Sequence, residues 1–563
     1  MMFKEIWNSY KRLAIHSSLG RVLTSVMVVV FIAFMIVMVE FAIPKGDIQL
    51  IVKLGVVYMF VNILRGITTL YEDFSETSLQ KNVEADYREK IFVKLQNMKQ
   101  IEMERLNSGS ILENILNDTK EVGKYWMWGI NRPYSAGLLR LVGSLVALMY
   151  LNVPIIIVAM LIYMIGFIVT FIFNKRSLKF TEQKRKMNAK ILNFSNEQIS
   201  GFETIKSLEV QNTRIAELKN LLKDYEAAVD KLEKNIRIYT CLYDYIVSFV
   251  LVVTILLGGI GVLKGFASYG TLIILARYIS SPKIYSVWVI EGFQYRNVSE
   301  ISYQKILDIL EKEEEKIEEG EVLEKVDKVE FKDINFAYNE NQKVLNGISL
   351  QVNKNEKVAL IGRTGSGKTS LVNLLCRFYD LENGEILING QNYKHYSIRS
   401  LRDKIGYIMQ KVVIFDGTIL ENINYDGKDI SKEKIIEICK KLNLHDKIMQ
   451  FENGYETVIN SETDLFSNGE KQMINFARVM VENPDIIILD EATASLSYKS
   501  EMLVRNAIDE ITKDKISFII AHRLSTIKNC DKILLMQDGK IIEQGNHENL
   551  MQKQGEYYKL INV

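Results

Sequence analysis

The sequence predicts two folds in one chain: an α-helical transmembrane domain of six spans, then an α/β P-loop domain with a helical subdomain. Apolar runs of about 20 residues, long enough to cross roughly 30 Å of hydrocarbon, recur along residues 1–300. From about residue 326, short β-like runs alternate with helical runs, and a glycine-rich loop joins a strand to a helix. We expect domains at 1–311 and 328–563, joined by a charged, water-facing linker at 312–327.

The composition narrows the classes of function. The chain has 563 residues, more than one domain usually holds. Its 70 Lys and Arg nearly cancel 69 Asp and Glu, so bulk charge gives no argument for a nucleic-acid partner. The cysteines are far apart, which argues against a disulfide framework or a zinc site and fits a reducing cytosolic face. They are Cys241, Cys376, Cys439 and Cys530.

The first 300 residues contain six candidate membrane spans. Arg277 and "SSPK" at 280–283 interrupt the last of them. The long charged segments at 72–125 and 174–238 follow the second and fourth spans, so positive-inside logic places both termini in the cytosol. We expect the membrane to be the cytoplasmic membrane of a bacterium. A signal peptide is the alternative for the first run, but that run is too long and lacks a cleavage pattern. The spans are expected at about 22–44, 48–70, 134–152, 154–173, 239–263 and 268–290.

The two long charged segments have helical patterns, which predicts that membrane helices continue into the cytosol as stalks. Within them, "GSILENILNDTKEV" at 109–122 and "NEQISGFETIKSLEV" at 196–210 each combine a glycine with a polar cluster. Either stretch alone indicates a helix–turn–helix with no function attached.

The second half contains the stretch "GRTGSGKTS", which follows the buried-strand run "EKVALIG" and precedes a helical run. This is Gly-x4-Gly-Lys-Thr in the strand–loop–helix setting that a phosphate-binding loop requires. Its glycines let backbone N–H groups surround phosphates, Lys368 supplies a positive charge, and the Thr369 hydroxyl suits Mg²⁺. The candidate nucleotide-binding residues here are Gly362, Arg363, Thr364, Gly365, Ser366, Gly367, Lys368, Thr369 and Ser370.

Further candidate residues follow short apolar runs. In "IIILDEAT", Asp490 suits the Mg²⁺ shell together with Thr369, and Glu491 suits a base that orients the attacking water. His522 in "FIIAH" is placed to reach the γ-phosphate, although a strand-end histidine is more often structural. Gln410 in "IGYIMQ" suits contact with both metal and water. Tyr338 in "INFAY" offers a ring for adenine, although a lone tyrosine usually packs.

Taken together, the ordered motifs resemble the ABC transporter superfamily in its exporter half-transporter form, over essentially the whole chain. They are "INFAY", "GRTGSGKT", "IGYIMQ", "FSNGEKQ", "IIILDEAT", "ASLS" and "IIAH". The resemblance implies a dimer in which ATP and Mg²⁺ lie between one chain's P-loop and the other chain's signature motif. It also implies that 109–122 and 196–210 couple the two domains, with the helix after Gln410 receiving them.

This sequence departs from the family at its signature. Where the family has Leu-Ser-Gly-Gly-Gln, the chain has Phe466, Ser467, Asn468, Gly469 and Glu470. A carboxylate about 8 Å from a phosphate charge costs roughly 2 kcal/mol at an effective dielectric near 20. Upstream, "INSET" at 459–463 replaces a Gly-Glu pair, and Ser497 replaces an aspartate. These changes lie on surfaces that act across the dimer, whereas the residues for the chain's own nucleotide are intact.

That asymmetry predicts a heterodimer with one strong and one degenerate ATP site, whose partner lacks the equivalent of Glu491. A homodimer with two slow sites, or an ATP-gated channel or sensor, is the alternative. The expected substrate is an amphipathic drug-like molecule, peptide or lipid. Arg140 and Arg277 either line a cavity that attracts an anionic or amphipathic substrate or form interhelical pairs, for example with Asp244.

Overall fold

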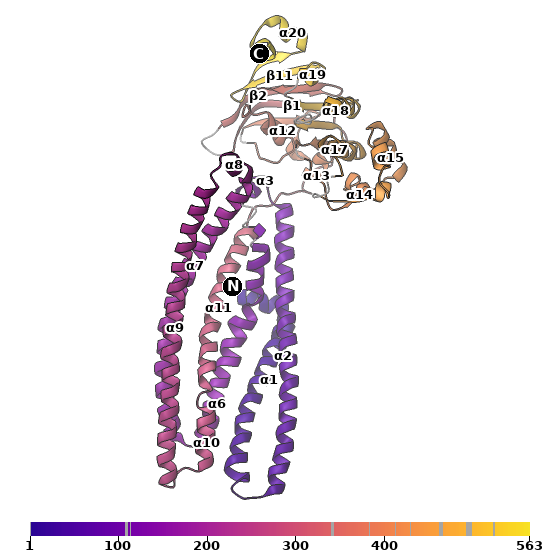
Figure 1. The fold of residues 1–563 in the computed structure, drawn as a ribbon. Helices are drawn as coiled ribbons and strands as arrows, with labels where there is room; N and C mark the ends of the chain where they lie inside the picture. The colour runs from indigo at the N-terminus through magenta and orange to yellow at the C-terminus, as the bar shows by residue number, and fades with distance from the viewer. Residues whose placement is uncertain are drawn as a thin grey trace. The chain divides into compact units, whose positions relative to one another are not determined.

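The computed structural model describes residues 2–106, 111–112, 114–338, 343–381, 383–410, 412–427, 429–460, 465–490, 498–521 and 524–562. The chain divides into two compact units (Figure 1). The membrane unit comprises Met1–Gln96 and Leu106–Lys312, and the P-loop unit comprises Asn97–Arg105 and Glu313–Val563.

The membrane unit is built from helices, three of them π-helical segments (η1, η2 and η3) in the described residues. They are α1 (Met2–Val37), η1 (Met38–Ala42), α2 (Ile48–Asn97), η2 (Asn114–Asp118), α5 (Thr119–Gly123), η3 (Tyr125–Leu138), α6 (Leu139–Met149), α7 (Val153–Ser200), α8 (Phe202–Ser207), α9 (Gln211–Leu263), α10 (Tyr269–Tyr278) and α11 (Pro282–Leu310).

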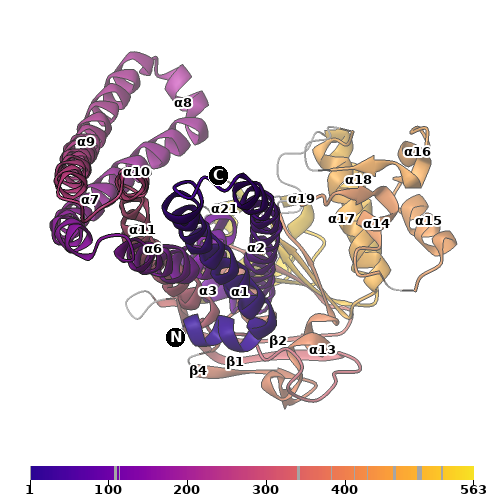
Figure 2. The same ribbon diagram turned by 90° about the horizontal axis from the view of Figure 1, so that it is seen from below.

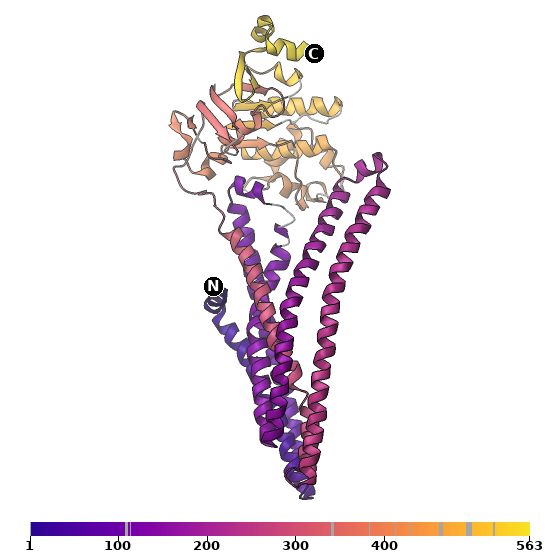
Figure 3. The same cartoon turned by 90° about the vertical axis from the view of Figure 1, so that its left-hand side faces the viewer.

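The stalk prediction agrees with the lengths of the helices. Helices α2, α7 and α9 have 50, 48 and 53 residues. At ~1.5 Å per residue each is about 75 Å long, more than twice the hydrocarbon thickness. The short α8 joins α7 to α9 at the predicted helix–turn–helix of 196–210, and Figures 1 and 3 show the resulting hairpin.

Four helices of the described chain are long and apolar enough to cross a membrane: Met2–Ala42, Ile48–Asn97, Val153–Ser200 and Gln211–Leu263. The predicted third span instead falls on η3 and α6. The predicted sixth span, 268–290, is not one helix, because α10 ends at Tyr278 and α11 begins at Pro282. A proline at the first turn starts a helix but cannot continue one from the preceding turn. The count of six spans therefore stays a prediction.

In the described part of the P-loop unit, the main sheet has the strand order β12-β11-β3-β10-β9-β6. Its strands β11, β3, β10, β9 and β6 are parallel, and β12 is an antiparallel edge. Parallel strands are buried on both faces, which explains continuous apolar runs such as "IIIL". The bounds are β3 (Lys357–Ile361), β6 (Ile405–Ile408), β9 (Ile486–Asp490), β10 (Ile516–Ile520), β11 (Lys532–Gln537) and β12 (Lys540–Gly545).

A second, antiparallel sheet has the order β2-β1-β4-β5, and β7 pairs with β8. Their bounds are β1 (Lys328–Ala337), β2 (Lys343–Asn353), β4 (Asn383–Ile388), β5 (Gln391–Asn392), β7 (Gly417–Thr418) and β8 (Val458–Ile459).

The predicted helical subdomain is a group of helices that lies to one side of the unit, away from β1 and β4 (Figure 2). It comprises α14 (Ile419–Ile423), α15 (Lys432–Lys441), α16 (His445–Ile448), α17 (Asn468–Glu482) and α18 (Tyr498–Ile511). The remaining helices are α3 (Gln100–Arg105), α12 (Lys368–Leu375), η4 (Tyr393–His395), α13 (Ile398–Arg402), η5 (Gly454–Glu456), α19 (Leu524–Ile527), α20 (His547–Lys553) and α21 (Glu556–Asn562).

The charged stretch 312–327 is docked on the P-loop unit rather than fully exposed to water. Arg402 holds the Glu315 carboxylate in two hydrogen bonds of 2.6 and 2.9 Å. Leu323 and Val326 are buried in the same core as β1 and β3. The acidic composition predicted solvent exposure, but these ion pairs and two apolar side chains fix the segment in place.

Candidate functional site

The glycine-rich loop lies where the sequence predicted it, between β3 and α12. Gly362, Gly365 and Gly367 have φ values of 144°, 83° and 99°, which disfavour any side chain. A Cβ on Gly362 would lie 2.1 Å from the Met536 carbonyl oxygen, whereas one on Gly365 would meet nothing within 4 Å. The loop is therefore packed against β11 on one side and open at Gly365.

The polar groups of the loop fit a phosphate ligand. The Lys368 ammonium donates to the carbonyl oxygens of Gly362 and Arg363 at 2.9 and 3.0 Å. The hydroxyl of Ser366 is buried without a hydrogen-bond partner among the described residues. Thr369 is exposed in the first turn of α12, where the helix dipole favours an anion. A triphosphate would satisfy these donors, and Thr369 would supply an oxygen to its Mg²⁺.

The topology brings the other candidate residues to the same edge of the sheet as the loop. Asp490 is the last residue of β9, and Gln410 follows β6, the parallel neighbour of β9. Because β3 also ends at this edge, the carboxyl ends of three parallel strands meet there. Glu491 directly follows β9, and His522 comes two residues after the end of β10, but both lie outside the described residues, as does Ser497.

Tyr407 at this edge was not singled out from the sequence. Its phenol lies 3.4 Å from Asp490 Oδ2 and 3.3 Å from the Asn373 side-chain oxygen. Burial, and next the Asp490 carboxylate, raise the pKa of Tyr407, so the phenol remains a hydrogen-bond donor at neutral pH. Its place in "IGYIMQ", three residues before Gln410, is the signal that would have found it.

Tyr338 is held in an aromatic cluster. Its ring meets the rings of Phe336 and Tyr379 edge-on, at centroid distances of 4.9 and 5.0 Å. Its phenol and the Ser370 hydroxyl are 2.9 Å apart, which ties the ring to the first turn of α12. Tyr338 therefore packs and also borders the loop.

Residues 466–470, where the sequence predicted a departure from the family's signature, lie at the start of α17. Ser467 is the N-cap residue and Glu470 is the third residue of the helix, and each side chain bonds the other's backbone N–H. Phe466 is 4% exposed, and its ring meets that of Phe451 edge-on at 5.4 Å. Phe466 thus packs inside the helical subdomain, whereas Asn468 is exposed.

Comparison with known proteins decides the family. Residues 345–494 match the family model described as ABC transporter, and residues 15–281 match the ABC transporter transmembrane region. YheH of Bacillus subtilis, a probable multidrug resistance ABC transporter ATP-binding/permease protein, is 30% identical over 84% of this chain and 71% of its own length. This chain belongs to the ABC transporter family.

Other similar proteins have the same organisation. The ABC transporter ATP-binding protein YknU of Bacillus subtilis, itself uncharacterised, is 29% identical and aligns over 98% of this chain and 95% of its own length. The structure of a bacterial Atm1-family ABC exporter with ATP bound is 22% identical, has a TM-score of 0.81 and covers 98% of both chains. The transporter thus has the exporter-type fold, with a membrane domain fused to one nucleotide-binding domain. Its ABC domain binds ATP and is an ATPase coupled to transport, and half-transporters of this kind function as dimers.

The charged residues predicted in the transporter's membrane domain have partners other than those expected. Asp244 forms an ion pair with Lys283 rather than with either arginine. Arg140 is buried, and its Nε donates to the Ser25 hydroxyl at 2.9 Å. Arg277 is exposed beside Tyr278, 5.9 Å from that ring. The predicted ion pair of Asp244 with Arg140 or Arg277 was wrong, because the ammonium of Lys283 takes the Asp244 carboxylate instead.

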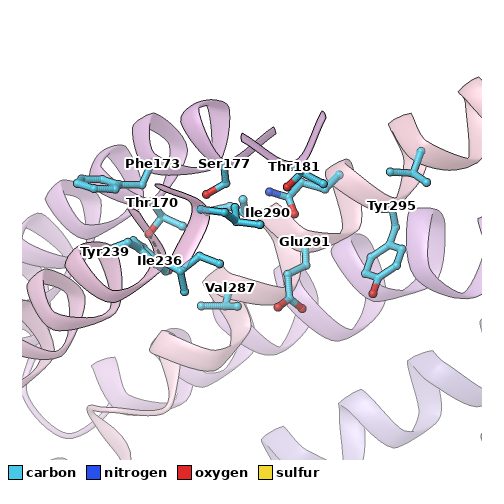
Figure 4. A pocket seen from close by; sticks show the side chains of 13 residues that line it. Thr170, Phe173, Ser177, Thr181, Ile236, Tyr239, Val287, Ile290, Glu291 and Tyr295 are labelled. Atoms are coloured by element: carbon cyan, nitrogen blue, oxygen red, sulfur yellow. Dashed lines mark hydrogen bonds between the residues drawn. The ribbon is translucent and has the colours of Figure 1, made fainter. Parts of the chain in front are cut away.

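A pocket of about 400 Å³ opens between α7, α9 and α11 of the transporter (Figure 4). The described residues that line it include the aromatic rings of Phe173, Tyr239 and Tyr295 and one charged side chain, that of Glu291. Arg140, Asp244 and Arg277 are not among them. Arg132 donates to one Glu291 oxygen at 3.0 Å, and its guanidinium lies 4.0 Å from the Trp128 ring centroid. Sequence patterns did not single out Glu291, because it follows the interrupted sixth run.

Proposed function

We propose that this transporter is one half of a heterodimeric exporter that uses ATP hydrolysis to move an amphipathic molecule out across the cytoplasmic membrane by alternating access. One observation carries the proposal. The same chain combines a phosphate-binding loop whose donors are all in place with a signature helix whose first turn carries a carboxylate, Glu470. Such a chain is suited to hydrolyse its own ATP but poorly suited to complete a partner's site.

In the strong site, this chain supplies everything except the signature. Lys368 binds the phosphates, and Thr369, Asp490 and Gln410 supply oxygens to Mg²⁺. Glu491 orients the attacking water, and His522 contacts the γ-phosphate. A partner chain contributes an intact signature and has no glutamate equivalent to Glu491. In the degenerate site, residues 467–470 of this chain face the partner's loop, and ATP is held rather than turned over.

The pocket residues favour a neutral or cationic amphiphile. A cation attracted by Glu291 can lie over the ring of Tyr239 or that of Tyr295, while the apolar wall takes a hydrophobic body. The multidrug exporters among the chain's relatives make drug-like molecules the first class to test. Arg140 and Arg277, which would attract an anionic substrate, do not line this pocket.

The test of the heterodimer is reconstitution of the chain in lipid vesicles, with and without the product of a neighbouring ABC reading frame. We expect weak ATP hydrolysis from the chain alone and strong, substrate-stimulated hydrolysis from the pair. Robust hydrolysis by the chain alone, together with the absence of an ABC half lacking the Glu491 equivalent, favours the homodimer and contradicts the proposal.

Glu491→Gln separates an exporter from an ATP-gated channel. In an exporter, the substitution abolishes steady-state hydrolysis and vesicle transport together, because each transport cycle requires the activated water. In a channel opened by ATP binding, flux continues while hydrolysis stops. The measurement is substrate flux and phosphate release from the same vesicles.

A further inference from the structure

The first turn of α17 already binds an anion from its own chain. The backbone N–H and the hydroxyl of Ser467 both donate to Oε2 of Glu470 at 2.8 Å. In return the Glu470 N–H donates to the Ser467 hydroxyl oxygen at 3.3 Å. The single hydroxyl hydrogen of Ser467 is therefore directed to this carboxylate. The N-terminus of a 15-residue helix, which favours negative charge, has that charge supplied internally.

A second contact holds the carboxylate in this position. Lys447 of α16 lies 3.7 Å from Glu470 Oε1, and about one third of each side chain is exposed. The same ammonium lies 5.6 Å from the ring centroid of Phe451, which packs on Phe466. Glu470 is thus bound from its own helix and from the neighbouring helix, and the two other departures in the motif take no part in these bonds.

We propose that the Glu470 carboxylate is an internal substitute for the γ-phosphate. This carboxylate occupies the Ser467 hydroxyl and the start of α17, and so keeps the signature from binding ATP on a partner's loop. The inference rests on the proposed function in one respect, namely that the signature faces a partner's P-loop. It goes further by assigning the weakness of that site to one removable charge. Glutamine retains the hydrogen-bond acceptor but is neutral, and Ser467 then prefers a charged phosphate oxygen.

The test uses photolabelling with 8-azido-ATP of the full chain, reconstituted with its partner, with the two chains separated by size. Glu470→Gln is expected to lower the half-saturating nucleotide concentration on the partner chain roughly tenfold, because one repelling charge is removed. Labelling of this chain itself stays unchanged. Glu433→Gln removes an exposed first-turn glutamate from α15 and is the matched control.

Ser467→Ala tests the occupied hydroxyl directly. In the wild-type background it is expected to alter the half-saturating concentration less than about twofold, since the hydroxyl already serves Glu470. In the Glu470→Gln background, Ser467→Ala is expected to raise the half-saturating concentration most of the way back to the wild-type value. A large loss from Ser467→Ala alone, or no gain from Glu470→Gln in a pair that assembles and hydrolyses ATP, overturns the inference and leaves the proposed function standing.

A failure of the heterodimer proposal can also be distinguished from a failure of this inference. If the chain alone forms a closed dimer, Glu470→Gln is expected to tighten labelling on both of its copies. That result contradicts the heterodimer but supports the substitute phosphate. Melting curves of every variant exclude a loss of folding, because a lost N-cap alone lowers stability by about 1 kcal/mol.

Discussion

The phenol of Tyr379 donates a hydrogen bond to the carboxylate of Glu104, 275 residues earlier in the chain. Glu104 lies on α3, which belongs to the P-loop unit although it directly follows the membrane helix α2. The ring of Tyr379 also meets that of Tyr338, the proposed adenine platform, at 5.0 Å. Burial, and next the Glu104 hydrogen bond, raise the pKa of Tyr379, so the phenol stays protonated as the donor.

Tyr379→Phe is therefore expected to loosen α3, which follows the membrane helix α2 in sequence, from the P-loop unit while the ring packing remains. ATP affinity should change less than about twofold, whereas stimulation of hydrolysis by substrate should fall several-fold, because about 1–2 kcal/mol of a charge-assisted bond is lost. Nucleotide titration and substrate-stimulated phosphate release measure the two quantities. Tyr396→Phe, which removes a bond to Gln391 at 3.2 Å, is the control. Equal losses in both quantities contradict a coupling role.

Glu291→Gln is expected to change which substrates stimulate the transporter. A cationic amphiphile should need roughly tenfold more concentration for half-maximal stimulation, because the charge that attracts it is gone. A neutral amphiphile of similar size should be unaffected. Glu300→Gln, on the same helix α11 and paired with Arg296, provides the control. Identical shifts for both substrates indicate that Glu291 acts on the fold rather than on the ligand.

Arg21 is expected to be essential for stability of the membrane unit. Its guanidinium binds Glu72 at 2.6 Å and Glu76 through Nε at 3.0 Å, and both carboxylates are nearly fully buried. Arg21→Gln leaves two buried acids one helical turn apart, which costs about 3–5 kcal/mol. The thermal midpoint in detergent should drop clearly, and adding Glu76→Gln should restore part of it.

The control for Arg21 is Arg296→Gln, which removes an exposed pair with Glu300 on one helix. Such pairs contribute about 0–1 kcal/mol, so the midpoint should hardly move. An equal loss from both variants is incompatible with a special role for the buried cluster.

The phosphate-binding loop could be predicted from the sequence because its determinants are local. A buried strand, three glycines at positive φ and a helix lie within twenty residues, and the parallel order of β3, β9 and β6 then brings Asp490 and Gln410 to the same edge. The hydrogen bonds between Ser467 and Glu470 could also be predicted from the sequence, since Ser-x-x-Glu before a helix is the capping-box spacing.

Contacts between distant segments could not be predicted. The α3 stretch "QIEMER" has too few apolar residues to indicate a partner, and Glu104 meets Tyr379 only through the fold. The partner of Asp244 depends on the break between α10 and α11, which places Lys283 on the first turn of a new helix. Charge alone gave Arg140 and Arg277 as candidate partners, whereas the break places Lys283 beside Asp244 instead.

The cysteines of the P-loop unit are expected to be unreactive until that unit unfolds. Burial raises the pKa of Cys376 and Cys530 to about 12 and that of Cys439 to about 11, whereas Cys241 of the membrane unit is exposed. At pH 8 a thiol with a pKa of about 11 is roughly one-thousandth thiolate, and the thiolate is the reactive form. Maleimide followed by peptide mass spectrometry should label Cys241 first in the folded protein, and the other three together as denaturant unfolds their unit. The thiolate fraction rises about tenfold per pH unit below the pKa. If ionisation of the thiol limits the labelling of Cys439, the labelling rate should therefore rise from pH 8 to pH 9. If access of maleimide to the buried thiol limits it, the labelling rate should stay constant.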